Sequence, residues 1–210
     1  MQAANFSGVS ARDIQVWRGD RHVLRGVSVE VAATQIVHIA GSNGVGKTTL
    51  LRVLAGLLTA EQGSVNWQGR PITANFESYA ATLAYLGHSD ALKADFTARE
   101  NLSHEVGLRR PVTGTEIDEA LARVGLAGCR DLPARVLSAG QRRRLAMARV
   151  MLTATMLWII DEPFTNLDHA GVLVLSDVIA GQVDGGGAVI IAAHQPPAIP
   201  RYPARCVDLA

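Results

Sequence analysis

The chain has 210 residues, of which 48% are hydrophobic and 19% charged, and its formal net charge is +1. This is the composition of an ordinary globular protein, and the near-neutral charge argues against a dedicated nucleic-acid surface. No apolar run approaches the roughly 18 residues of a membrane-spanning helix, so we expect membrane contact only through a partner.

The first eight residues lack a basic segment followed by a hydrophobic stretch, so we expect no secretory signal and a cytoplasmic location. Cys129 and Cys206 lack metal-site or redox-motif spacing and are expected to be buried free thiols.

The predicted elements begin with strands in alternating or β-branched runs. We expect strands at 14–17, 27–31, 35–40, 63–69 and 83–87, the first two antiparallel around a polar turn at 18–21, and a helix at 48–56. Helical signals dominate next: Thr97 and Glu100 have capping-box spacing, and Ile117, Leu121 and Val124 repeat on one helical face. Helices are then expected at 141–152 and 170–183, and buried strands at 156–160 and 188–193. The alternation predicts an α/β fold with a mixed β core, antiparallel N-terminal strands and a helical subdomain at about 88–153.

Between the strand at 35–40 and the helix at 48–56 lies a glycine-rich loop with the spacing of a phosphate-binding loop. It reads Gly41, Ser42, Asn43, Gly44, Val45, Gly46, Lys47, Thr48 and Thr49. Glycines let successive N–H groups close around phosphate oxygens, Lys47 neutralises phosphate charge, and the Thr48 hydroxyl can ligate Mg²⁺. The alternative is a glycine-rich turn that matches by chance, which the flanking strand and helix disfavour.

A second element places Asp161 and Glu162 at the end of an apolar strand. Strand alternation predicts that the two carboxylates point to opposite sides, so we assign Asp161 to the metal and Glu162 to the attacking water as general base. A strand ending in a solvated acidic turn is the competing interpretation.

A third element is Leu137-Ser138-Ala139-Gly140-Gln141 followed by an arginine-rich helix, and here the sequence resembles the ATP-binding cassette (ABC) family. The resemblance covers almost the whole chain and implies that residues 1–210 form one ATP-binding domain. It also implies that Ser138, Gly140 and Gln141 meet the nucleotide of a second copy, so two copies would sandwich two ATP molecules. We expect the arginines at 142–144 to lie on a solvated helix face rather than in a nucleic-acid patch.

The resemblance assigns further roles one residue at a time. Trp17 would stack on adenine, His194 would contact the γ-phosphate beside Glu162, and Asp168 would couple the two sites. The competing structural roles are a packed strand aromatic, a structural histidine and a helix N-cap. Ala139 stands where the family has glycine and is expected to disfavour a positive φ there.

His88 stands where the family places a glutamine, and a surface histidine is the alternative interpretation. Together with motifs elsewhere in the chain, it makes the sequence resemble the ABC ATPases of cytochrome c biogenesis. These motifs are residues 85–93 with Leu102, the Ser42-Asn43 pair, 137–141, 157–165 and 193–195. That resemblance implies an ATPase at the cytoplasmic face of a bacterial inner membrane, working with a CcmB-type permease and other haem-handling membrane subunits. An ATPase of another exporter, a soluble ABC protein and a nucleotide-binding scaffold without hydrolysis remain as alternatives.

Overall fold

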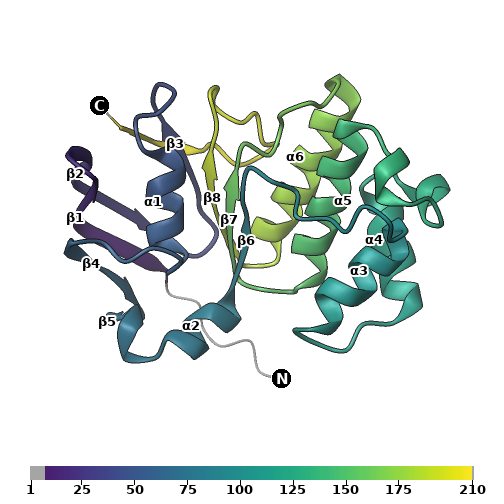
Figure 1. The fold of residues 1–210 in the computed structure, drawn as a ribbon, viewed down its shortest axis with the longest axis horizontal. Coiled ribbons are helices and arrows are strands. Elements are labelled where there is room, and N and C mark those ends of the chain that lie inside the picture. The colour runs from purple at the N-terminus through teal and green to yellow at the C-terminus, as the bar shows by residue number, and fades with distance from the viewer. Residues whose placement is uncertain (1–7, 210) are drawn as a thin grey trace.

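The computed structural model describes residues 8–209, so the expectation about a signal in residues 1–7 lies outside it (Figure 1). The strands in this range are β1 Val9–Arg18, β2 Arg21–Val31, β3 Ile36–Ala40, β4 Gln62–Trp67, β5 Arg70–Pro71, β6 Leu83–Leu86, β7 Leu157–Asp161, β8 Ala188–Ala192 and β9 Arg205–Asp208. The α-helices are α1 Lys47–Leu54, α2 Phe76–Thr82, α3 Ala98–Gly107, α4 Gly114–Arg123, α5 Ala139–Leu152 and α6 His169–Asp184. Short 3₁₀ helices lie at Ile72–Ala74, Ala127–Cys129 and Ala134–Val136.

The strands form two sheets. The first is antiparallel with the order β2-β1-β4-β5, and the second is parallel with the order β6-β7-β8-β3-β9. In Figure 1, α1 lies between the two sheets, α5 and α6 cover the other face of the parallel sheet, and α3 and α4 lie beyond α5. The α/β fold class is therefore confirmed, with the antiparallel and parallel strands in separate sheets.

Each face of the parallel sheet supports its own hydrophobic core, because side chains alternate along a strand. On β7, Leu157 and Ile159 pack with α1 and the antiparallel sheet, whereas Trp158 and Ile160 pack with the helices on the other side. All five β7 residues are buried. This two-sided burial explains why β7 and β8 are continuous apolar runs in the sequence.

The helix caps follow the local sequence. Thr97 and Glu100 form the predicted capping box at the start of α3, with Thr97 N–H donating to Glu100 Oε2 at 2.8 Å. Ile117, Leu121 and Val124 are buried on one face, as predicted. The expectation of two buried thiols is wrong, because Cys129 is half-buried and Cys206, on the edge strand β9, is exposed.

Candidate nucleotide-binding site

The candidate site lies at the carboxyl edge of the parallel sheet. Because β6, β7, β8 and β3 are parallel neighbours, the residues that follow them meet at one edge, where open α/β sheets bind ligands. A pocket of about 570 Å³ opens at this edge. The predicted site residues that line it are Asn43, Gly44, Gly46, Lys47, Thr48, Thr49, Asp161, Glu162 and His194.

The loop between β3 and α1 is shaped by its glycines. Gly41, Gly44 and Gly46 have φ values of 135°, 76° and 121°, which other residues rarely adopt. A Cβ at Gly46 would lie 2.8 Å from the Leu24 side chain, so the loop passes close to β2. Gly46 is also the N-cap of α1 and provides no side-chain cap, which leaves the first N–H groups of the helix for an anion.

Lys47 places a positive charge at the centre of this loop. The residue is 7% exposed, and its Nζ donates to the carbonyls of Gly41 at 2.7 Å and Ser42 at 3.2 Å. Arg21, which the sequence analysis missed, donates to the Gly44 carbonyl at 2.8 Å and lines the pocket together with Arg18. A buried ammonium that meets only neutral carbonyls within the described residues fits the phosphates of ATP. Ser42 is exposed and Val45 packs on the core beneath the loop.

The Thr48 hydroxyl donates to Asp161 Oδ2 at 2.7 Å, joining the glycine loop to the end of β7. Asp161 is 2% exposed. A hydroxyl and a carboxylate side by side are the hard oxygen donors that Mg²⁺ takes, so these two residues fit the predicted metal site.

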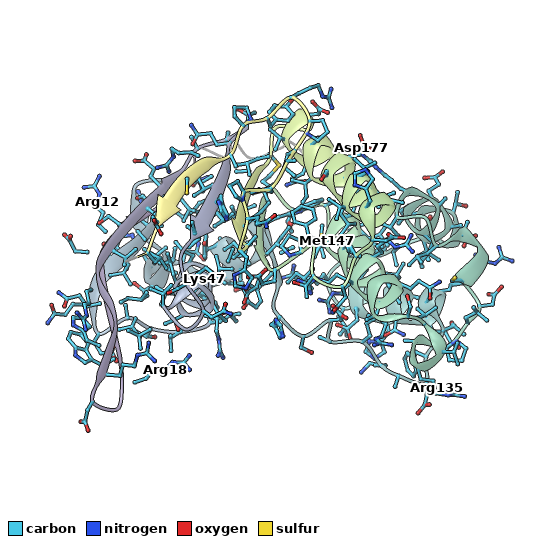
Figure 2. All side chains as sticks on the ribbon, turned by 90° about the horizontal axis from the view of Figure 1, so that it is seen from above. Arg12, Arg18, Lys47, Arg135, Met147 and Asp177 are labelled. Carbon is cyan, nitrogen blue, oxygen red and sulfur yellow. The ribbon has the colours of Figure 1, made fainter. Side chains whose placement is uncertain are left out.

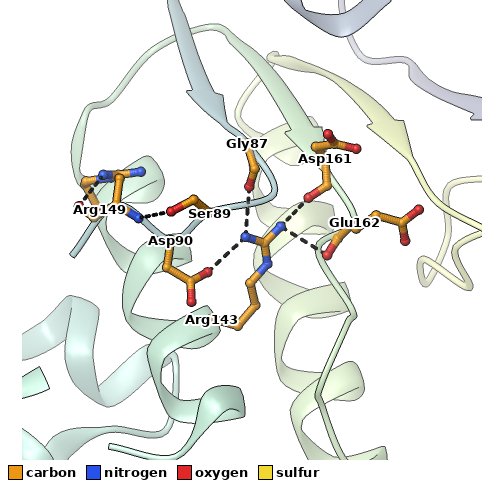
Figure 3. A network of polar contacts seen from close by, with 8 residues as sticks. Gly87, Ser89, Asp90, Arg143, Arg149, Asp161 and Glu162 are labelled. Atoms are coloured by element: carbon orange, nitrogen blue, oxygen red, sulfur yellow. Dashed lines mark hydrogen bonds and ion pairs between the residues drawn. The ribbon is translucent and has the colours of Figure 1, made fainter. Parts of the chain in front are cut away.

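Glu162 follows directly and does not continue the strand. Its φ is 51°, and this left-handed conformation turns its carboxylate so that Asp161 and Glu162 line the same pocket. Figure 3 shows both carboxylates on the side away from Arg143. The expectation that the two carboxylates point to opposite sides is therefore wrong, because β7 ends at Asp161.

His194 follows β8 and lies beside Glu162. Its Nε2 is 3.7 Å from Glu162 Oε1, and the side chains are 56% and 17% exposed, respectively. His88, which follows β6, lines this pocket too and also lines a second, more apolar pocket on the neighbouring surface. The structure thus brings both histidines to the site.

Trp17 lies near the end of β1, on the hairpin that supplies Arg18 and Arg21. Its ring stacks on His22 with the ring centroids 3.9 Å apart and the planes 6° from parallel. Trp17 is half-buried and does not itself line the pocket. One face of the indole is therefore occupied by His22 within the described chain.

Ser138, Gly140 and Gln141 begin α5 and do not line this pocket. Ser138 N–H donates to Gln141 Oε1 at 2.8 Å, and Gln141 N–H donates to Ser138 Oγ at 3.1 Å, which forms a capping box. The Ser138 hydroxyl proton remains available to a ligand because Oγ serves as the acceptor in that box. Figure 2 shows Lys47 and Arg135, three residues before Ser138, on well-separated parts of the molecule.

Ala139 is the first residue of α5 and does not have a positive φ. The methyl group of Ala139 is therefore compatible with the backbone conformation at this position. Gly140 is the constrained position, because a Cβ there would lie 2.8 Å from the carbonyl oxygen of Asn166.

Asp168 caps α6 by accepting the Gly171 N–H at 2.8 Å, which is the structural role considered in the sequence analysis. It is exposed and does not line the pocket of its own chain.

The arginines at the start of α5 are not a solvated face, which corrects the sequence-based expectation. Arg143 is 4% exposed and binds four acceptors, while Arg142 and Arg144 donate to the carbonyls of Leu137 and Val124. Their hydrogen bonds to carbonyls hold α5 against the segments around it.

The fold, the glycine loop and the carboxylates are those of the ABC transporter ATPases, and residues 24–165 match the family model described as ABC transporter. The chain belongs to this family and is an ATP hydrolase that powers transport. It is similar to the cytochrome c biogenesis ATP-binding export protein CcmA of Salmonella typhi, with 45% identity over 188 residues and 90% of each chain. The protein of the same name from Aromatoleum aromaticum is 46% identical over 191 residues, which are 88% of this chain and 87% of that one. A solved ATP-binding subunit of an ABC transporter shares the fold, with a TM-score of 0.84 at 23% identity over 96% of this chain and 85% of that one.

Proposed function

We propose that the chain hydrolyses ATP with Glu162 as general base and His194 as its partner. The observation that carries the proposal is the meeting of Lys47, Glu162 and His194 in one pocket at the carboxyl edge of the sheet. Glu162 would accept a proton from the attacking water, and His194 would hold the γ-phosphate and orient that water. Lys47 and the N–H groups at the start of α1 would bind the phosphates.

Thr48 and Asp161 would hold Mg²⁺, since their side-chain oxygens already lie 2.7 Å apart. When bound, the ion would offset the negative charge of the β- and γ-phosphates. Trp17 would stack on the adenine through the ring face that His22 does not occupy.

Glu162→Gln tests the base role. The variant should bind ATP as the natural chain does and lose about 10²- to 10⁴-fold in turnover, the usual contribution of a general base. Glu119→Gln, an exposed change on α4, is the matched control and should keep full turnover. Undiminished hydrolysis in Glu162→Gln would remove Glu162 from this role.

We further propose that residues 1–210 form one ATP-binding domain, that helices within 88–153 form a subdomain carrying Ser138, and that two copies pair head to tail. The 137–141 segment, here called the signature, lies outside the pocket of its own chain, and the start of α5 is suited to an anion. Ser138, Gly140 and Gln141 would then complete the pocket of the second copy, and Asp168 would lie between the two sites.

Mixing two inactive variants tests this pairing. A Lys47→Ala chain lacks a working glycine loop and a Ser138→Arg chain lacks a working signature, so only a mixed dimer contains one intact site. With equal mixing and independent sites, activity should return to roughly a quarter of the natural level. If both halves of a site came from one chain, mixing would restore nothing.

The second pocket is the proposed docking site for a CcmB-type permease. It measures about 820 Å³ and contains exposed apolar side chains, with Phe76 45% and Leu108 75% exposed, beside the cations Arg52 and Arg109. An amphipathic helix with acidic ends would complement it.

Among residues 8–209, no helix has the length and apolar character needed to cross a membrane. Membrane contact would therefore pass through the permease, with the chain at the cytoplasmic face of a bacterial inner membrane. Leu108→Asp should reduce copurification with the permease and leave ATP binding unchanged.

The transporter is proposed to serve c-type cytochrome maturation by haem handling, together with other haem-handling membrane subunits. The support is the 45% identity to a protein named for cytochrome c biogenesis. Deletion of the chain in its host should abolish covalently haem-bearing cytochromes, and the natural chain should restore them where Lys47→Ala does not. Normal maturation in the deletion strain would overturn the cytochrome role and leave the ATPase assignment intact.

A further inference from the structure

Arg143 joins three segments that are distant in the sequence. Its Nη1 donates to the Gly87 carbonyl at 3.1 Å and to Asp90 Oδ1 at 3.0 Å. Its Nη2 donates to the carbonyls of Asp161 and Glu162, the latter at 3.0 Å. Figure 3 shows the guanidinium between the loop after β6 and the end of β7. One buried cation thus links α5, whose N-cap is Ser138, to the 87–91 loop and to the backbone carbonyls of Asp161 and Glu162.

Glu162 depends on such support because of its backbone. A φ of 51° is unfavourable for a residue with a side chain, so the neighbouring structure has to hold it. Two hydrogen bonds do so: Glu162 N–H donates to the Ala192 carbonyl at 2.8 Å, and Glu162 C=O accepts from Arg143. The conformation that turns the carboxylate into the pocket is therefore fixed in part by Arg143.

The other end of the link lies at the boundary of the two pockets. Gly87, Ser89 and Ala91 line the apolar pocket, and His88 lines both pockets. Asp90 lies within this loop but lines neither pocket, because its side chain is turned inward to Arg143 and is 25% exposed. A displacement of the loop would pull on Asp90, and Arg143 would carry it to the carbonyl of Glu162.

We propose that Asp90 and Arg143 are positioning residues that couple the 87–91 loop to the backbone of Glu162. A partner seated in the apolar pocket would change hydrolysis by this route, without touching nucleotide. This inference rests on the proposed base role of Glu162 and on the proposed docking site.

Asp90→Asn is the first test, because it keeps the size and the acceptor oxygen but removes the charge. In the transporter complex, kcat should fall about tenfold, the effect of a small loss of transition-state positioning. KM for ATP should stay within about twofold, because Asp90 does not line the nucleotide pocket. Arg143→Lys keeps the charge but not the forked geometry, and should lower kcat further. The double variant should be no worse than Arg143→Lys, since both changes break one link.

The matched control is the ion pair of Asp95 and Arg135, because Asp95 lies four residues beyond the 87–91 loop in the same connection between β6 and α3. Its charged atoms lie 2.8 Å apart, but the side chains are 86% and 57% exposed and make no contact with the site carboxylates within the described residues. Asp95→Asn should leave kcat and KM unchanged.

Unchanged kcat in Asp90→Asn would overturn the inference, and so would a fall in kcat matched by an equal rise in KM and a lower melting temperature. Hydrolysis that persists in Glu162→Gln would instead overturn the proposed base role, and the coupling with it. A selective loss of kcat in Asp90→Asn, with Asp95→Asn unaffected, would support the coupling.

Discussion

Replacing Gly140 by alanine tests whether the signature is positioned by contact with the segment that follows Glu162. A Cβ at position 140 would lie 2.8 Å from the Asn166 carbonyl oxygen and 3.5 Å from Leu167 Cδ2. Because the nearest atom belongs to the backbone, either the start of α5 or the 166–168 segment has to move. Overpacking of this kind costs about 1–3 kcal/mol, which for a chain of this size lowers the melting temperature by roughly 2–12 °C.

The same shift moves the N–H groups of α5 that would face a second copy's γ-phosphate. Each loss of about 1.4 kcal/mol in transition-state stabilisation is a tenfold loss of rate, so we expect kcat to fall at least about tenfold in Gly140→Ala. ATP affinity should change by less than about twofold, because Gly140 does not line the pocket of its own chain. Thermal unfolding, equilibrium ATP binding and steady-state hydrolysis measure the three quantities. Natural values of both melting temperature and kcat in Gly140→Ala would refute the reasoning.

Ala139→Gly is the neighbouring control. Position 139 begins the helix without a positive φ, so glycine there relieves no strain and costs about 0.5–1 kcal/mol of backbone entropy. Turnover should stay within about twofold of the natural chain. A marked rise would show that the methyl group disturbs the signature after all.

Three further changes test other parts of the structure. Trp17→Ala should weaken ATP binding by about 0.5–1.5 kcal/mol, the value of an aromatic stack, and Trp17→Phe should retain most of it in an equilibrium binding assay. Tyr79→Phe leaves the Leu54 carbonyl, now bonded by the buried phenol at 2.5 Å, without that donor, and should cost about 1–3 kcal/mol of unfolding free energy in urea. The hydrogen bond from the Thr113 N–H lowers the pKa of Glu116 in the folded state. The cap therefore stabilises the fold at pH values above the unfolded pKa of Glu116, and this stability is lost as the pH falls through the folded pKa. Glu116→Gln should lower the free energy of unfolding at neutral pH and much less in acid.

The sequence predicted most of the elements that surround the pocket because each has a strong local signal. β7 and β8 are continuous apolar runs, and α3 begins with a capping box. α2 was missed because Tyr79 is the single buried residue on it, so no apolar stripe marks the helix. β9 was missed because three of its four residues are exposed on the edge of the sheet.

In the site, residues that belong to local motifs could be predicted from the sequence, and residues that act through long-range contacts could not. Lys47, Thr48 and Asp161 were predicted from local motifs, and the structure places all three at one pocket. The roles of Arg21 and Arg143 depend on contacts with residues 23 positions away and up to 56 positions away. Near-neutral net charge suggested solvation for the arginine run, but it cannot show that a buried guanidinium finds four acceptors. The conformation of Glu162 was equally hidden, since strand periodicity gives no sign of where a strand ends.

The contacts that hold the 87–91 loop explain why histidine can stand at position 88, where the resemblance leads us to expect glutamine. Arg143 binds the loop at Gly87 and Asp90, and the buried Asn101 amide binds the backbone of Lys93 on both its N–H and C=O sides. The loop is therefore fixed on both sides of position 88 by groups other than the side chain at 88. The side chain at position 88 is therefore not needed to shape the loop, whether it is glutamine or histidine, and it can line the pocket instead. Imidazole offers one donor and one acceptor in its neutral form, so histidine in place of glutamine changes the polar group that lines the pocket and leaves the Asp90–Arg143 link intact.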